Sequence, residues 1–394
     1  MDFLYDDEQD ALREAVKGLV GKAYGDYENR RQAVSVSSGG DDPGFDEKLW
    51  ARMAEMGLLG LPFAEEDGGV GAGPVEIGIV CQELGRVIAP EPYLTSVVLA
   101  GGLVSACGTA EQRRELLGAL SAGERVLAFA HDEPGRGWTP SAEKVRAERV
   151  AATRDGDAWT LTGVKEPVPH GARADVLVVS AALPDGGTGL FVVDGALAER
   201  TGYPTYDGTR AARVAFDGTP ATPLGEAGRD MTASISTVQD ITRVMAANQA
   251  LGAMQFLLPT TTEYLRSRKQ FGVPLATFQA LTFRAADMYV SLQLTHSMVD
   301  WATMVVAQAS HDQPDPVAVA DAARRVSVQV STAGRHLGQE AIQLHGGIAM
   351  TMEYSVGMYT AHLTALDHLL GDGRHHLREL AAAVTTYDAL DPLA

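Results

Sequence analysis

The first third of the chain has the hydrophobic pattern of amphipathic helices. From residue 7 to about residue 122, apolar side chains recur at spacings of three and four, as at Leu12, Val16 and Leu19. Clusters of Gly and Pro separate these periodic segments, as is typical of turns between helices. The pattern therefore predicts an N-terminal helical domain over residues 1–122.

The middle of the chain has a different pattern. Between residues 125 and 224, short apolar runs alternate with DG, GG and PDGG turns, and these runs include VLAFA, AWTLTG, ADVLVVSA, GLFVV and ARVAF. Short runs bounded by such turns are typical of strands joined by tight connections. We expect a compact β-domain over residues 123–231.

Long helical periods return from residue 232 and predict a helical bundle over residues 232–394. Pro259 lies inside the first of these helices, where it would remove a backbone hydrogen bond and meet the carbonyl of Gln255, so we expect a kink. The order of helices, small sheet and helices contains no alternating βα units, which argues against a doubly wound parallel sheet. The predicted fold class is α+β.

The composition excludes several classes of partner and indicates the cellular compartment. The 394 residues include 51 acidic and 32 basic side chains, for a formal charge of −19, which disfavours nucleic acid and anionic lipid as partners. The acidic N-terminus lacks the features of a signal peptide, and no apolar run approaches membrane-spanning length. Cys81 and Cys107 lie in apolar segments without metal-type spacing. We expect a cytoplasmic protein in a reducing compartment.

Several chemistries lack their sequence signals. The sequence has no H-E-x-x-H, no paired C-x-x-C and no G-x-S-x-G, so we expect neither a metal site nor a serine hydrolase. GGVGAGP, residues 68–74, lacks the G-x-G-x-x-G register and is interpreted as a turn between helices. His375 and His376 are adjacent and would point in different directions on a helix, so we expect solvated side chains. After these exclusions, the remaining expectation is a reaction that depends on an organic cofactor held by helix surfaces.

Several segments together resemble the acyl-CoA dehydrogenase family. SRKQFGVPLATFQALTFRAADM, residues 267–288, resembles the family's Arg-x-Gln-Phe-Gly stretch with its following helix, and AIQLHGGIAMTMEY, residues 341–354, resembles its Gln-x-x-Gly-Gly segment. Weaker similarities, in chain order, are MGLLGLPFAEEDGGVG, DEPG, GDAWTLTGVK and ARVAFDGTPATPLGE. The resemblance implies a helical domain, a β-domain and a four-helix bundle within a tetramer.

The resemblance also implies a reaction. A carboxylate base takes the α-proton of an acyl-CoA thioester while FAD accepts the β-hydrogen as hydride, which leaves a 2,3 double bond. An electron-transfer flavoprotein would then accept the electrons. By resemblance, Arg268 would hold the FAD pyrophosphate, because a guanidinium can give it two N–H bonds.

The other cofactor-binding residues implied by the resemblance belong to two groups and would serve the FAD of a neighbouring subunit. The first group would line the adenosine side of the FAD site and consists of Gln270, Phe271, Phe278 and Gln279. The second group would form the second wall of that site and consists of Gln343, Leu344, His345, Gly346 and Gly347. An exposed arginine and an ordinary bundle turn are the alternatives. Asp240 and Arg243 share a helix face and would bind the acyl-CoA thioester, or else form only an intrahelical salt bridge.

The family's catalytic base is missing from its usual positions. Counting sixteen residues from Tyr354 leads to Leu370 rather than glutamate, and the second location holds Thr242. Asp372, two residues after Leu370, is the remaining candidate for the catalytic base. The segment that would cover the flavin ring reads Glu166, Pro167, Val168 and Pro169, and Gly137, Trp138 and Thr139 replace the family's Gly-Ser-Asp. Prolines offer no N–H to the ring.

The chain thus keeps residues that bind a neighbour's FAD and lacks those that hold its own. This asymmetry resembles the small-subunit type of heteromeric α2β2 acyl-CoA dehydrogenases, in which a homologous partner chain would supply the catalytic glutamate. Two alternatives remain open. The chain could form a self-sufficient homotetramer with Asp372 as base, or it could be a catalytically silent scaffold or acyl-CoA-binding subunit.

Overall fold

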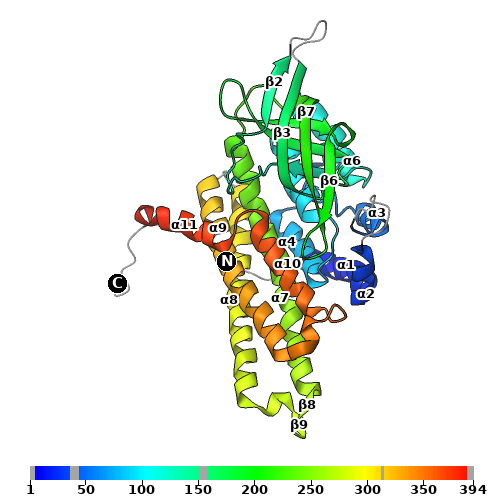
Figure 1. Ribbon diagram of the computed structural model, residues 1–394, viewed down its shortest axis with the longest axis vertical. Helices are drawn as coiled ribbons and strands as arrows, with labels where there is room; N and C mark the ends of the chain where they lie inside the picture. Colours follow the sequence, from blue (N-terminus) through cyan, green and yellow to red (C-terminus); the bar gives the residue numbers. More distant parts are fainter. Residues whose placement is uncertain (1–4, 36–43, 151–157, 312–314, 388–394) are drawn as a thin grey trace.

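The computed structural model describes residues 5–35, 44–150, 158–311 and 315–387 (Figure 1). Its N-terminal region is helical, as the sequence predicts. The segment SVSSGGDDPG, residues 35–44, whose composition predicts a loop, lies mostly outside the described residues. The elements of this region are α1 (Asp7–Tyr24), α2 (Tyr27–Ala33), α3 (Glu47–Glu55), the short 3₁₀ turn η1 (Glu65–Asp67), α4 (Pro74–Arg86), the π-helical η2 (Tyr93–Gly101), α5 (Gly102–Cys107) and α6 (Ala110–Ser121).

Local sequence explains where these helices begin. Asp6 before α1 and Thr109 before α6 each form a capping box with the glutamine three residues later, which satisfies backbone N–H groups that the helix itself leaves unpaired. Pro74 opens α4 in its first turn, where a missing N–H costs nothing. The segment at residues 68–74 is therefore a turn into a helix, as predicted.

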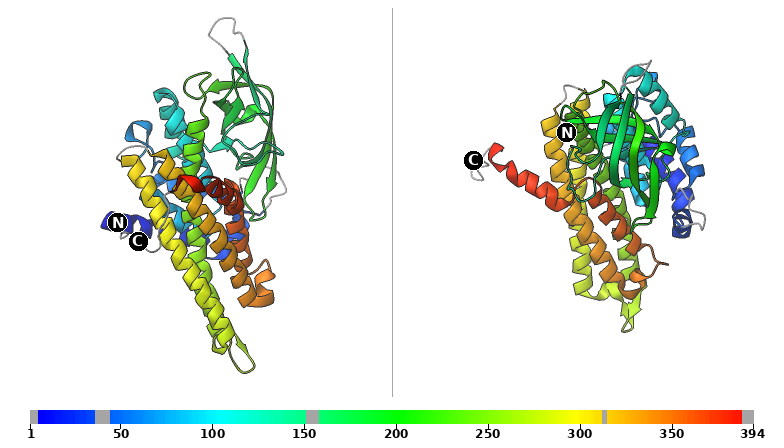
Figure 2. Two further views of the ribbon diagram at one scale, coloured as in Figure 1. Left: turned by 90° about the vertical axis from the view of Figure 1, so that its left-hand side faces the viewer. Right: turned by 45° about the horizontal axis from the view of Figure 1, so that its top comes forward.

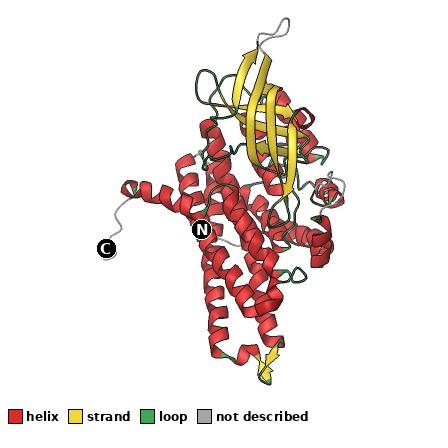
Figure 3. Ribbon diagram, in the orientation of Figure 1, coloured by secondary structure: helices red, strands yellow, loops and turns green. Residues whose placement is uncertain are grey.

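A seven-stranded sheet occupies the middle of the chain (Figure 3). Its main path runs β1-β4-β2-β3-β7-β5, with β6 on β7, and pairing of β4 with β5 closes it into a barrel-like sheet. The five expected strands are present, together with two others, β2 and β6. The strands are β1 (Leu127–Ala130), β2 (Arg146–Val150), β3 (Ala158–Pro169), β4 (Val176–Ala182), β5 (Thr188–Asp194), β6 (Glu199–Pro204) and β7 (Arg210–Pro223).

The C-terminal region is a helical bundle (Figure 2). Pro259 lies inside α7, which continues through it, and the kink at this residue stays a prediction. A small hairpin of β8 (Lys269–Gln270) and β9 (Val273–Pro274) joins α7 to α8 at the far end of the bundle (Figure 1). The helices are α7 (Thr232–Ser267), α8 (Gln279–His311), α9 (Pro316–His345), α10 (Val356–Leu369) and α11 (Gly373–Ala382), and the short 3₁₀ turns of the chain's second half are η3 (Gly195–Leu197), η4 (Leu275–Thr277), η5 (Gly346–Met350) and η6 (Val384–Thr386).

The hydrophobic core confirms the α+β fold class. One cluster of buried residues runs from the N-terminal helices through α7 into the other bundle helices, and a second fills the interior of the sheet. Helix α7 packs against α4, α8 and α9, so it joins the two helical regions. Within the described residues, no helix is both long and apolar enough to cross a membrane.

Candidate functional site

The far end of the bundle brings together the first group of predicted FAD residues. Arg268 follows the last residue of α7 and is exposed, as are Gln270 and Gln279. Phe271, at the turn of the β8–β9 hairpin, is 92% exposed with a φ of +53°, and its ring lies edge-on to that of Phe278 at 6.1 Å. A left-handed backbone is uncommon for a bulky residue. The single chain therefore holds an aromatic side chain in solvent at some cost.

The second group of predicted residues lies at the same end of the bundle. The His345 ring is 4.4 Å from that of Tyr264, one helical turn before Arg268, and its Nδ1–H donates to the Ala341 carbonyl at 2.7 Å. The side chains of Leu344 and His345 are buried, so only their backbone can face an external ligand. The neighbouring Gln343 is exposed.

The glycine pair at the start of η5 leaves open space on the surface. Gly346 has a φ of +69°, which explains glycine there, whereas a Cβ at either Gly346 or Gly347 would meet no atom within 4 Å. Packing within the chain therefore does not require Gly347. Bare backbone at the same end of the bundle as an exposed guanidinium and an aromatic edge is a set of groups that fits a pyrophosphate and an adenine. These residues fit the nucleotide half of FAD.

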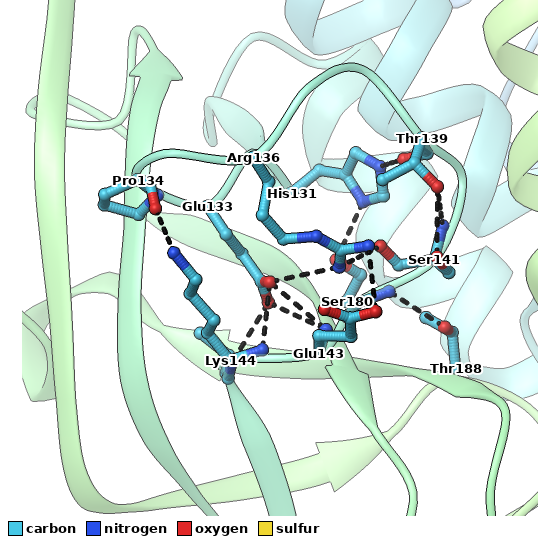
Figure 4. Close-up of polar contacts among 12 residues, drawn as sticks. His131, Glu133, Pro134, Arg136, Thr139, Ser141, Glu143, Lys144, Ser180 and Thr188 are labelled. Carbon is cyan, nitrogen blue, oxygen red and sulfur yellow. Dashed lines mark hydrogen bonds and ion pairs between the residues drawn. The ribbon is translucent and has the colours of Figure 1, made fainter.

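The β-region contains a buried ion pair of Lys165 and Glu133 that sequence reasoning missed, and Figure 4 shows the polar contacts around Glu133. Lys165, fully buried, donates from Nζ to Glu133 Oε1 at 3.0 Å, to the His131 carbonyl at 2.8 Å and to Ser180 Oγ at 3.1 Å. Both residues lie in segments that resemble the family, DEPG and GDAWTLTGVK. Nothing in those segments signals that the two side chains meet, because the contact depends on the tertiary fold.

Further hydrogen bonds fix the Glu133 carboxylate. It accepts the backbone N–H groups of Val145 at 3.0 Å and Lys144 at 2.9 Å, and Arg136 donates at 3.3 Å (Figure 4). Burial acts to raise the pKa of Glu133, but the Lys165 charge and these N–H donors lower it to about 2. Burial also lowers the pKa of Lys165, to about 8, against the opposing effect of Glu133. The network holds the loop after β1 in one conformation.

Trp138 lies within that loop and reaches the C-terminal helices. Its ring centroid lies 6.4 Å from that of His368 and 5.6 Å from that of His375. The expectation of solvated histidines is wrong for His376, which is only 2% exposed because α11 turns it inward. Burial first, and then the charge of Arg243, lower its pKa to about 3.

A cleft of about 930 Å³ opens between η2 and the first turns of α7, and Asp240 lines it. Arg243 donates from Nη1 to Asp240 Oδ1 at 2.6 Å, so the intrahelical pair exists. Arg243 Nε also donates to the Leu370 carbonyl at 2.9 Å, which ties the end of α10 to α7. Asp240 and Arg268 are 28 residues apart on or just after α7, or about 42 Å along a helix. The cleft and the glycine pair are separate sites.

Of the three candidate base positions, two carry no carboxylate and the third carries one that caps a helix. Leu370 is half-buried at the end of α10. Thr242 is fully buried, and its Oγ1 donates to the Val238 carbonyl at 2.7 Å. Asp372 is the N-cap of α11, where Oδ1 accepts the backbone N–H of His375 at 2.7 Å.

Comparison with known proteins identifies the family. The acyl-CoA dehydrogenase N-terminal domain model matches residues 6–124, and the C-terminal domain model matches residues 232–385. The chain belongs to the acyl-CoA dehydrogenase family, whose members are FAD-dependent oxidoreductases.

Particular relatives extend over nearly the whole chain. Acyl-CoA dehydrogenase IpdE2 of Mycobacterium tuberculosis is 30% identical, covering 96% of this chain and 98% of its own. A solved variant of the Tcur3481-Tcur3483 steroid acyl-CoA dehydrogenase is 29% identical with a TM-score of 0.83, covering 96% of this chain and 98% of its own. The ChsE4-ChsE5 complex from Mycobacterium tuberculosis is 25% identical with a TM-score of 0.84, covering 99% and 100%.

Proposed function

We propose that this chain is the FAD-clamping subunit of a heteromeric acyl-CoA dehydrogenase that introduces a 2,3 double bond into an acyl-CoA thioester. A homologous partner chain supplies the catalytic glutamate and the residues around the flavin ring. The observation that carries the proposal is that the positions where the family has its catalytic base hold no suitable carboxylate. Leu370 cannot accept a proton, and the Thr242 hydroxyl is buried and bonded to its own helix.

The Asp372 carboxylate is used for structure. An N-cap aspartate satisfies backbone donors and stabilises its helix by about 1 kcal/mol, and Asp372 makes this bond at 2.7 Å. A general base must come within hydrogen-bond reach of the α-proton, and the cap bond holds the Asp372 carboxylate at the start of α11, two residues after the expected base position. The structure thus favours the heteromer over a self-sufficient homotetramer.

The two halves of the cofactor place different demands on the chain. Bound FAD would supply the hydride-accepting chemistry. Arg268 and the glycine pair would orient the nucleotide half at the exposed end of the bundle. In the β-region, Pro167 and Pro169 offer no N–H, and Trp138 packs against α10 and α11. This contrast supports an FAD that is shared with another chain.

An exposed apolar surface supports a protein partner. Four large side chains on α8 are more than half exposed along one helix: Phe283 at 60%, Tyr289 at 55%, Val290 at 55% and Leu294 at 62%. Phe283, Val290 and Leu294 recur at helical spacing and share one face of α8, and exposed apolar groups on one face mark interaction surfaces. We assign the surface to the homologous subunit, and by family analogy an electron-transfer flavoprotein accepts the electrons.

The cleft beside α7 suits the acyl end of the substrate. Its lining is apolar with a few hydroxyl groups, and Asp240 is the only charged side chain among the lining residues that the structure describes. Without Lys or Arg, this lining does not match the phosphates of coenzyme A. An acyl group held here would distinguish an acyl-CoA-binding subunit from a purely structural one.

Expression of the chain alone and with its homologous partner tests the proposal. We expect native mass measurement to give a heterotetramer, with flavin and thioester oxidation only in the co-expressed sample. Arg268→Ala should lower the flavin content of that sample, whereas Arg266→Ala, also exposed and two residues earlier, should not. A stoichiometric FAD complement with thioester oxidation by the chain alone would refute the proposal.

A further inference from the structure

A seam between the β-region and the C-terminal helices runs past Leu370, the position where the family has its catalytic base. On its β side, β3 ends at Pro169 and the loop after β1 carries Trp138. On its bundle side, α10 ends at Leu369 and α11 begins at Gly373. By the resemblance, a flavin ring held by this chain would lie in this seam, next to the base position and covered by the segment that ends at Pro169.

Two hollows reach the last turn of α10 in the described part of the chain, and both are small. One, of about 80 Å³, is lined by Pro169 and Leu369 among others. The other, of about 30 Å³, is lined by Leu369, Leu370 and Arg243 among others. Pockets for small ligands and cofactors measure about 300–1,000 Å³. Neither hollow therefore has room for the three fused rings of a flavin.

Trp138 reaches across the seam next to this turn. Its ring centroid lies 5.6 Å from that of His375 on α11. It lies 6.4 Å from that of His368, which directly precedes Leu369 on α10. The resemblance expects a serine in place of Trp138, and a serine side chain is too short to reach either histidine. The indole thus joins the two sides of the seam where a small residue would leave space.

Hydrogen bonds on both sides of Trp138 fix the loop that carries it (Figure 4). His131 Nε2 donates to the carbonyl of the next residue, Thr139, at 2.6 Å. Arg136, two residues before the indole, donates from Nη1 to the Ser141 carbonyl at 3.1 Å. The same loop contains one partner of the buried ion pair described above. The loop therefore cannot carry the indole out of the seam without breaking these bonds.

We propose that Trp138 closes this chain's own flavin position, so that an assembly with the homologous partner binds one FAD for each pair of chains. The β-region does not fit a flavin ring, because Trp138 fills the seam and Pro167 and Pro169 offer no N–H. The nucleotide half, by contrast, fits Arg268 and the glycine pair at the far end of the bundle. The inference rests on the proposed function, because the partner chain is taken to hold the ring.

The flavin content of the co-expressed assembly tests the inference. Native mass measurement gives the number of chains, and the absorbance of flavin released by denaturation gives the amount of FAD per chain. We expect one FAD for every two chains, also after incubation with excess FAD. One FAD per chain would overturn the inference and leave the heteromer standing. FAD with thioester oxidation in this chain alone would refute the proposed function, and an assembly that takes up no FAD would refute both.

Substitution of Trp138 tests whether this side chain is the obstacle. Trp138→Phe keeps a ring and should leave the ratio at one FAD for two chains. Trp138→Ser opens the seam and should raise the ratio toward one FAD per chain under excess FAD. An unchanged ratio in Trp138→Ser would overturn the role of Trp138. If that variant does not fold, a crystal structure of the FAD-loaded assembly decides, because a flavin ring between this loop and α11 would contradict the inference and an indole packed on His375 would support it.

Discussion

Replacing Glu91 by glutamine should make the protein less sensitive to rising pH. Glu91 is 5% exposed, and burial raises its pKa from 4.5 to about 7. Between these two values the unfolded chain releases this proton and the folded chain retains it. Glu91 therefore contributes stability that is fully present below pH 4.5 and is lost as the pH rises through 7. Each pKa unit corresponds to about 1.4 kcal/mol, so the loss is about 3 kcal/mol.

Comparison of the two proteins isolates this effect from other titrations in the same pH range. Burial lowers the pKa of His131 and of His170 to about 4, so both add stability as the pH rises from 4 to 6.5. Asp132, whose pKa burial raises to about 6, acts in the same direction as Glu91. Groups unaffected by the Glu91→Gln change cancel in the difference. Glutamine keeps an oxygen that can accept from Tyr24, so the local packing is preserved.

The assay is urea unfolding of the full-length protein and of Glu91→Gln from pH 4.5 to 8, at equal chain concentration because association shifts apparent stability. The free energy of unfolding of the variant, relative to the parent, should rise by about 3 kcal/mol across this range. The groups that face Glu91 and could share its proton are Tyr24, Asp46, His170, Asp207 and His362. A difference that stays flat with pH would refute the argument that Glu91 is protonated in the folded state.

Three further substitutions test the sites. Asp372→Asn should leave turnover of the assembly within about twofold, because asparagine caps a helix about as well as aspartate; abolished thioester oxidation would identify Asp372 as the base. Arg268→Ala should weaken FAD binding roughly ten- to hundredfold in flavin titrations, the value of one charge-assisted contact, with Arg266→Ala as the control. Lys165→Met should cost about 3–5 kcal/mol in urea unfolding, because it leaves Glu133 buried without its cation; a loss below 1 kcal/mol would contradict this.

Apolar periodicity predicts the elements that bury a continuous face. The five expected strands carry apolar runs that pack inside the sheet, such as Leu177 and Val179 of β4. Strand β6 has no fully buried residue, because it lies at the outer edge of β7, and β2 reads RAERV with few apolar positions. Their pairing is set by neighbouring strands, so their own sequences carry little signal.

The site residues also divide into those that a sequence motif signals and those whose surroundings depend on tertiary contacts. Arg268, Phe271 and Gly346 come from two motifs that lie at one end of the bundle, where Tyr264 and His345 join the two segments, and their role in FAD binding stays a prediction. Contacts between distant segments were not predictable in this way. The burial of His376 depends on the direction in which α11 leaves the bundle after Gly371, whose φ is +112°.

Arg243 shows how a residue pair that matches the family can have two separate tasks. Asp240 lines the cleft, while the guanidinium of Arg243 donates both to Asp240 and to the Leu370 carbonyl. Leu370 is the C-cap of α10, where carbonyl groups lack helical partners and a positive charge is favourable. Arg243 therefore holds in place the backbone at which a base would stand, although the side chain there is leucine. The contact between α7 and the end of α10 is thus present although residue 370 is leucine, which agrees with the proposed role of this chain as a subunit whose partner supplies the base.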